Sequence, residues 1–276
     1  MSLCSIFLGC SPENQKIYSQ DGELVYKECQ DCGIIWRSEA SFDLEQLYNE
    51  QYFDSKNYAA NRPHKVEKSV WLLDLALSIN PDIKSILEVG CSLGNTLEAA
   101  SRKRLDHLGI DVSSFAVEFC HKKGLNASNE TLEQLVDQVR SFDLIFMQHV
   151  LEHFKNPFKV LRQCNQLLPS QGLVIVLIPN SKYYRARRLR EKHKFYSIRG
   201  VGIEHYVYFN YDNLPRVLAS CGFKVLQLNY PLWVSSHDSI KFLINRTGRR
   251  MLSIFNLDQE LVVIASKVDV PGEYTG

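Results

Sequence analysis

The sequence has no long hydrophobic run and no excess of charge of either sign. None of its apolar stretches approaches the roughly 20 residues that a membrane-spanning helix needs, so we expect no membrane-bound segment. Its 32 basic and 31 acidic residues give a formal net charge of +1, which argues against a general affinity for nucleic acid or for a membrane surface. The sequence also shows no internal repeat and no low-complexity segment. Its 276 residues are enough for one α/β domain with appendages, or for two small domains.

The N-terminus lacks the features of a signal peptide. The apolar stretch Ser2–Gly9 is short and no basic region precedes it, although Cys10 follows it. We therefore expect a cytoplasmic protein. Four cysteines stand singly in segments that have the pattern of buried helices or strands, and we interpret them as reduced core thiols: Cys91, Cys120, Cys164 and Cys221.

Strand and helix patterns alternate from residue 66 onward. An apolar strand at 85–89, a helical pattern at 95–104 and a strand at 107–111 predict a β-α-β unit with a right-handed crossover. Further strands are expected at 125–127, 142–148, 172–179, 223–228 and 261–267. The pattern predicts an α/β fold with a doubly wound, mostly parallel, seven-stranded sheet.

Three parts can be distinguished along the chain. Residues 1–45 have the pattern of a small β-rich module, residues 46–65 of a connector or lid rich in tyrosine and asparagine, and residues 66–276 of the α/β domain.

A glycine-containing turn and an acidic residue mark a nucleoside-binding site. Gly90 and Gly94 stand where the first strand of the α/β domain turns into a helix, a place where small residues let the backbone approach a ligand. Asp111 ends the next strand, where a carboxylate can accept both hydroxyl protons of a ribose. A nicotinamide dehydrogenase uses similar elements, but its Gly-x-Gly-x-x-Gly is missing because Ser92 stands between the glycines.

The order and spacing of four segments resemble those of the class I S-adenosylmethionine-dependent methyltransferases. The likeness spans residues 66 to 267, and its segments are 88–94 (EVGCSLG), 108–113 (LGIDVS), 142–145 with 149–153 (FDLI, HVLEH) and 167–174 (LLPSQGLV). It implies a Rossmann-like fold, S-adenosylmethionine as cofactor, and methyl transfer. The cofactor-binding residues that it implies are Glu88, Gly90, Cys91, Ser92, Gly94, Asp111, Val112, Thr131, Leu132 and Gln148. Two departures are Ser92, where many members have glycine, and the lack of an obvious aspartate for the adenine amino group.

The segment after the fourth strand carries His149, Glu152 and His153, which would share one face if the segment were helical. Some members of the family bind a divalent metal through Glu-x-x-Glu-His, so a metal here is one interpretation. In the other, which we favour, Glu152 and His153 fix the turn while His149 lies near the transferable methyl group and acts as a catalytic residue.

A second catalytic candidate is His205. It lies in GIEHYVYF (202–209), which resembles the Glu-His-x-x-x-Phe segment of small-molecule members, and His205 could act as a base. The alternative is a packed structural histidine. The basic run 182–194 favours an anionic acceptor if it is not simply a solvated helix face.

Four further cysteines predict a structural zinc site. Cys29-x-x-Cys32-Gly33 is a good zinc knuckle, whereas Cys4 and Cys10 have an irregular spacing with five residues between them. This arrangement resembles a methyltransferase subgroup with an N-terminal zinc-ribbon-like module, several of whose members act in sugar, polysaccharide or natural-product pathways.

The sequence thus predicts a methyltransferase for a small polar acceptor, such as a nucleotide-linked or surface-polysaccharide sugar. No nucleic-acid or membrane partner is expected, and the oligomeric state stays open. The alternative function is a catalytically silent cofactor-binding module that recruits a partner protein.

Overall fold

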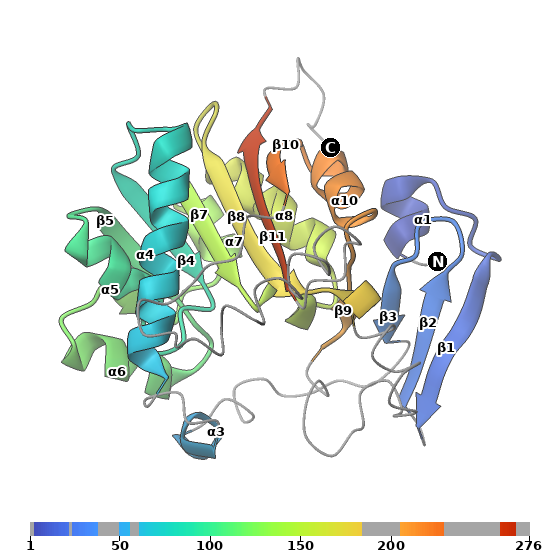
Figure 1. Ribbon diagram of the computed structural model, residues 1–276, viewed down its shortest axis with the longest axis horizontal. Helices are drawn as coiled ribbons and strands as arrows, with labels where there is room; N and C mark the ends of the chain where they lie inside the picture. The colour runs from blue at the N-terminus through green and yellow to red at the C-terminus, as the bar shows by residue number, and fades with distance from the viewer. Residues whose placement is uncertain are drawn as a thin grey trace, which may run out of the picture.

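The computed structural model describes residues 3–21, 24–37, 50–55, 61–183, 205–228 and 260–268. Its largest element is a seven-stranded sheet with the strand order β10-β11-β8-β7-β4-β5-β6 (Figure 1). Strands β8, β7, β4, β5 and β6 are parallel neighbours, while β11 runs antiparallel between β8 and β10. The predicted doubly wound, mostly parallel, seven-stranded sheet is therefore confirmed. The strand bounds are β4 Ser85–Val89, β5 Asp106–Ile110, β6 Ala127–Ser128, β7 Leu144–Gln148, β8 Leu173–Pro179, β10 Phe223–Leu228 and β11 Glu260–Lys267.

Helices cover both faces of this sheet because both faces are apolar. Successive strand residues point to opposite faces, so Phe146 of β7 packs with α4 and α5 while its neighbour Met147 packs with α7, α8 and α10. Figure 1 shows α4 in front of the sheet and α7 and α8 behind it. All seven residues of β8 are buried, as expected for a strand covered on both sides. The helix bounds are α4 Arg62–Ile79, α5 Asn95–Arg102, α6 Ser114–Lys122, α7 Leu132–Asp137, α8 Pro157–Gln166 and α10 Leu214–Ser220.

A second sheet is formed by the N-terminal module. The strands β1 (Gln15–Asp21), β2 (Leu24–Cys29) and β3 (Ile35–Arg37) are antiparallel neighbours, and the short strand β9 (Val207–Tyr208) completes the sheet at its β3 edge. Helix α1 (Leu3–Leu8) precedes these strands. The module is thus β-rich, as predicted, but it takes one strand from the α/β domain. The boundaries placed at residues 45 and 65 stay a prediction.

The predicted connector contributes one helix, α3 (Glu50–Ser55). Its Phe53 is buried with Leu93 and Ala116 and stacks on Phe115, with ring centroids 5.5 Å apart. The connector aromatic therefore packs beside the loop that follows β4. Residues 46–49 and 56–60 lie outside the described residues.

The segment 149–153 does not form the helix that would place three of its side chains on one face. Only Leu151–His153 forms a short 3₁₀ turn, η1, and His149 has a φ of 54°, in the left-handed region. No helix of the described residues is long and apolar enough to cross a membrane. Most of the predicted basic run, residues 184–194, lies outside the described part of the chain.

Candidate active site and metal centre

A left-handed turn connects β4 to α5. Gly90 and Gly94 have φ angles of 70° and 69°, a conformation that glycine adopts without strain. A Cβ atom would lie 2.6 Å from Val150 Cγ2 if built on Gly90, and 2.7 Å from Leu125 Cδ1 if built on Gly94. The Gly90 amide donates to the Ile110 carbonyl at 2.8 Å, which ties the turn to the end of β5. Both glycines are therefore required by backbone conformation and by space.

Asp111 fixes the same turn from the end of β5. Its Oδ2 accepts a hydrogen bond from the Ser92 amide at 2.8 Å, and its Oδ1 accepts one from the Ser113 amide at 2.9 Å. Burial raises the pKa of Asp111, and the two amide donors oppose this rise. Each carboxylate oxygen has a second acceptor position for a ligand hydroxyl. Beside it Val112 is 50% exposed, which leaves an apolar surface where a flat ring can lie.

Glu88 and Cys91 lie beneath the turn. Glu88, on β4, is 4% exposed and hydrogen-bonds through its side chain to Thr96, while its Oε2 has no hydrogen-bond partner among the described residues. Burial raises the pKa of Glu88 well above its usual value. Cys91 is 1% exposed and so close to Gly109 that a Cβ there would lie 2.6 Å from the Cys91 Cβ. The geometry gives Cys91 a supporting position under the turn.

The remaining residues expected at the cofactor lie around the ends of β6 and β7. Thr131 caps α7, because its hydroxyl accepts from the Gln134 amide at 3.2 Å and the Gln134 side chain accepts from the Thr131 amide. Leu132 is 6% exposed, and Gln148, at the end of β7, is half-buried. The cap thus fixes the position of Thr131 and uses its backbone amide and one acceptor position of its hydroxyl.

His149 bridges two strands through a charged network. Its Nε2 lies 2.9 Å from Oε1 of Glu260, at the start of β11, and its Nδ1 lies 3.6 Å from Oε1 of Glu152. Glu260 Oε2 in turn lies 2.6 Å from Lys68 Nζ on α4. Burial opposes the charged imidazole, but the two carboxylates outweigh this effect and raise the pKa of His149 to about 9. His149 is therefore a cation at neutral pH.

Glu152, His153 and His205 form a cluster at the same end of the sheet. One carboxylate oxygen of Glu152 and one ring nitrogen of each histidine all lie within 4.8 Å of one another. The two imidazole rings meet edge-on with centroids 4.6 Å apart. Glu152 is 1% exposed, and although burial raises its pKa, the nearby histidines outweigh this and lower it. The cluster is held by the backbone, because the Glu152 carbonyl accepts from the Tyr206 amide at 2.7 Å.

The structure thus groups the candidate histidines differently from what the sequence predicts. A common face of His149, Glu152 and His153 required a helix that does not form. Instead His205 joins Glu152 and His153 in one cluster, while His149 contacts both Glu152 and Glu260. Glu260 was missed, because a single glutamate 111 positions from His149 gives no local signal. Of the basic run, Lys182 is described, and its Nζ lies 2.6 Å from Asp212 Oδ2.

The candidate residues follow the carboxyl ends of three neighbouring parallel strands. Gly90 follows β4, Asp111 follows β5 and His149 follows β7. Ligands of open α/β sheets bind at this edge. The turn after β4 and Asp111 form one side of this region, and the cluster around Glu152 forms the other.

The four N-terminal cysteines form a second candidate centre. Their Sγ atoms all lie within 4.8 Å of one another, and all four residues are buried: Cys4, Cys10, Cys29 and Cys32. The irregular spacing of the first pair is resolved by α1, which carries Cys4, and by the turn at Gly9, where φ is 66°. The knuckle of the second pair closes through the Gly33 amide, which donates to the Cys29 carbonyl at 2.8 Å. Four converging thiols of this kind fit a tetrahedral zinc ion.

The fold and the glycine turn with Asp111 define the class as that of Rossmann-like, S-adenosylmethionine-dependent methyltransferases. A family model described as a methyltransferase domain matches residues 58–228, and the chain belongs to this family. Among solved structures, an S-adenosylmethionine-dependent methyltransferase from Archaeoglobus fulgidus has a TM-score of 0.56 and 16% identity, covering 79% of this chain and 100% of that chain. The magnesium protoporphyrin IX methyltransferase of Synechocystis PCC 6803, with bound SAH, has a TM-score of 0.56 and 12% identity, covering 81% and 98%. At such identities these likenesses show the fold.

Two curated relatives are named as ubiquinone biosynthesis O-methyltransferases. The protein of Methylococcus capsulatus is 33% identical over 98 residues, which is 33% of this chain and 41% of the relative. The protein of Bordetella avium is 28% identical over 111 residues, which is 38% and 45% of the two chains. This chain therefore spans less than half the length of the relatives it matches. Their names give no support to the sugar acceptor expected from the sequence.

Proposed function

We propose that the protein transfers a methyl group from S-adenosylmethionine to a hydroxyl oxygen of a small polar acceptor. The proposal rests on two groups of residues at the same edge of the sheet, one suited to hold the cofactor and the other suited to act on the acceptor. The turn at Gly90 and Asp111 offers backbone approach and ribose acceptors, while Glu152 and His205 offer a buried carboxylate and an imidazole. Methyl transfer from a sulfonium needs mainly this positioning, together with a base where the acceptor must lose a proton.

The cofactor, when bound, supplies an electrophilic methyl group. Asp111 would accept hydrogen bonds from the two ribose hydroxyls, and the exposed side chain of Val112 would offer an apolar surface to the adenine. Gly90 and Gly94 let the backbone approach the rest of the ligand. The departure at Ser92 fits this scheme, because its backbone amide holds Asp111 in place.

His205 is the proposed base. The bound cofactor would supply the methyl group to the acceptor oxygen, and a ring nitrogen of His205 would take the hydroxyl proton. The imidazolium that forms faces the buried Glu152 carboxylate, whose negative charge stabilises it. His149 contributes charge to this side of the site through its contacts with Glu152 and Glu260.

The four buried thiols are proposed to hold one structural Zn²⁺. In this role Cys4, Cys10, Cys29 and Cys32 act as thiolates, and the metal supplies folding energy to a small module. The support is the convergence of the four Sγ atoms.

The acceptor class is the finer part of the proposal. A nucleotide-linked or surface-polysaccharide sugar agrees with the zinc-ribbon-like module and with the basic run, and an anionic group on the acceptor would meet that run. The relatives named as ubiquinone biosynthesis O-methyltransferases instead favour an acceptor of that pathway.

Turnover with radiolabelled S-adenosylmethionine tests the function. Protein is incubated with nucleotide sugars, with polysaccharide fragments and with dihydroxybenzoates, and products are identified by mass spectrometry. Methylation in one arm assigns the acceptor class. Tight cofactor binding by calorimetry without transfer in any arm, or in a metabolite extract, would refute the enzyme and favour the silent module.

A further inference from the structure

The segment that carries His205 is held by the N-terminal module. The Tyr206 carbonyl accepts from the Arg37 amide of β3 at 2.8 Å, while the Tyr206 amide donates to the Glu152 carbonyl at 2.7 Å. The next two residues form β9, in which Val207 pairs with Trp36 of β3. The backbone that follows the proposed base therefore lies between the zinc module on one side and the turn after β7 on the other, and Figure 1 shows β9 between β3 and the large sheet.

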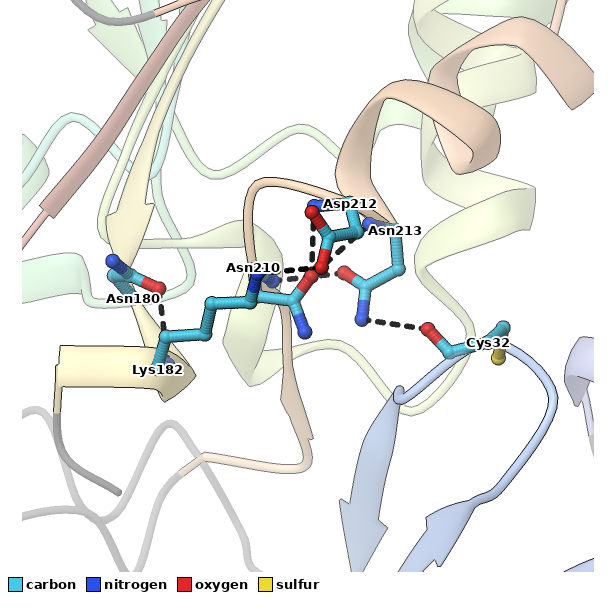
Figure 2. A network of polar contacts seen from close by, with 6 residues as sticks. All are labelled: Cys32, Asn180, Lys182, Asn210, Asp212 and Asn213. Atoms are coloured by element: carbon cyan, nitrogen blue, oxygen red, sulfur yellow. Dashed lines mark hydrogen bonds and ion pairs between the residues drawn. The ribbon is translucent and has the colours of Figure 1, made fainter. Parts of the chain in front are cut away.

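A buried asparagine makes a second connection, directly to the zinc knuckle. Asn213 Nδ2 donates to the carbonyl of Cys32 at 3.2 Å, and Asn213 Oδ1 accepts from the Asn210 amide at 2.8 Å. Asn210 Oδ1 accepts in turn from the amides of Asp212 and Asn213, so that the turn between β9 and α10 is closed by its own side chains (Figure 2). Asn213 is fully buried, and a buried amide or carbonyl that loses its partner is costly. The knuckle and this turn are thus joined by a hydrogen bond from a buried side chain.

Packing joins the two parts as well. The four cysteines and Ile34 belong to the same apolar core as Val207 and Phe158. Phe7 of α1 stacks on Phe158 of α8 with ring centroids 4.4 Å apart, and the guanidinium of Arg162 lies over the Phe7 ring at 4.7 Å. The module therefore packs directly against the α/β domain at α8.

We propose that the zinc knuckle is a positioning element of the methyl-transfer site, which acts through Asn213 and the β3–β9 pairing to fix the segment that carries His205. The proposal rests on the function proposed above and assigns the module a role beyond that of a cap. Among the described residues, the hydrogen bonds of the Gly90 turn to other segments run to Ile110, Asp111, Arg62 and Cys120, all of which lie outside the N-terminal module. Disturbing the knuckle should therefore impair transfer and spare cofactor affinity.

The test uses Asn213→Ala with Asn165→Ala as its matched control. Both variants lose an amide side chain that donates to a backbone carbonyl, since Asn165 Nδ2 donates to the Gly222 carbonyl at 2.9 Å, away from the knuckle. Four quantities are measured in full-length protein: zinc content, amide hydrogen exchange of residues 205–209, the Kd of S-adenosylmethionine, and kcat with the acceptor. For Asn213→Ala we expect retained zinc, exchange at 205–209 faster by about tenfold, a Kd within about twofold, and kcat lower by at least about tenfold. Asn165→Ala should leave all four near the wild-type values.

Removing zinc from the wild type with a chelator is the second arm. Exchange at 205–209 should rise, whereas exchange at the Gly90 turn and the Kd of the cofactor should stay unchanged. Unchanged exchange at 205–209 in both arms, or an equal loss of kcat in Asn165→Ala, would overturn the proposal. The exchange and zinc measurements need no turnover, so they test the coupling between the knuckle and residues 205–209 even if no acceptor is methylated. A failure to methylate any acceptor would count against the proposed function alone.

Discussion

The replacement of Asp111 by asparagine tests its proposed role in cofactor binding separately from its role in folding. The side chain keeps its size but exchanges one acceptor oxygen for an amino group, which cannot accept from the Ser92 or Ser113 amide. One backbone hydrogen bond to a charged group is lost, at about 2 kcal/mol of folding stability, and one ribose hydroxyl loses its acceptor, at about 2 kcal/mol of binding. We expect a lower melting temperature and a roughly 30-fold higher Kd for S-adenosylmethionine, measured by thermal unfolding and by titration calorimetry.

Asp143→Ala is the control for the stability component. Asp143 Oδ2 accepts from the amides of Lys84 and Ser85, each at 2.9 Å, and from the Ser85 hydroxyl at 3.0 Å, at the opposite end of β4. Its loss should destabilise the protein at least as much without changing cofactor affinity. Wild-type affinity in folded Asp111→Asn would remove Asp111 from the ribose site. An equal loss of affinity in the control would show that affinity only follows stability.

Four further outcomes are expected. Elemental analysis should find about one zinc per chain, lost when Cys29 and Cys32 are both changed to serine; a folded wild type without zinc would make these cysteines ordinary thiols. His149 has a folded pKa of about 9, above its unfolded value of about 6.5, so its stabilising contribution is present below pH 6.5 and is lost as the pH rises through 9. His149→Gln should remove this part of the stability–pH curve measured by denaturant unfolding, and a curve with the wild-type shape would contradict the assignment. His205→Ala should lower kcat at least about 100-fold with an unchanged cofactor Kd and should lose the acidic limb of the rate profile; a joint loss of stability and affinity would instead indicate a structural histidine. Glu152→Gln should shift the acidic limb of the rate profile to lower pH than in the wild type, because the imidazolium of His205 is less favoured without the Glu152 carboxylate. An unshifted limb would show that this carboxylate does not act on His205.

The sheet and the placing of the glycine turn beside Asp111 could be predicted because their signals are local in the chain. β7 and β8 read as continuous apolar runs because helices cover both sides of them. The turn at Gly90–Gly94 and Asp111 lie within one β-α-β unit, so their spacing along the chain fixes their spacing in the fold.

The acceptor half could not be assembled in the same way. His205 meets Glu152 through a backbone hydrogen bond between segments more than fifty residues apart, and β9 is only two residues long, which is too short for a periodic pattern. The expected common face of the segment depended on a helix, but only a short 3₁₀ turn forms, and His149 contacts the distant Glu260 as well as Glu152. Residue types identified the candidates, whereas their grouping depended on long-range contacts.

The charge of Glu152 connects the two histidines that the sequence singled out as catalytic. A carboxylate that is 1% exposed is costly unless a cation lies nearby. His149, with a pKa of about 9, supplies that cation at neutral pH, and its Nδ1 lies 3.6 Å from Glu152. His205 need not be protonated in the resting site to balance the buried charge, so its imidazole can accept the acceptor's proton. The two histidines therefore have different roles in the proposed mechanism. His149 favours the charged form of the Glu152 carboxylate, and this carboxylate stabilises His205 after it has taken the proton.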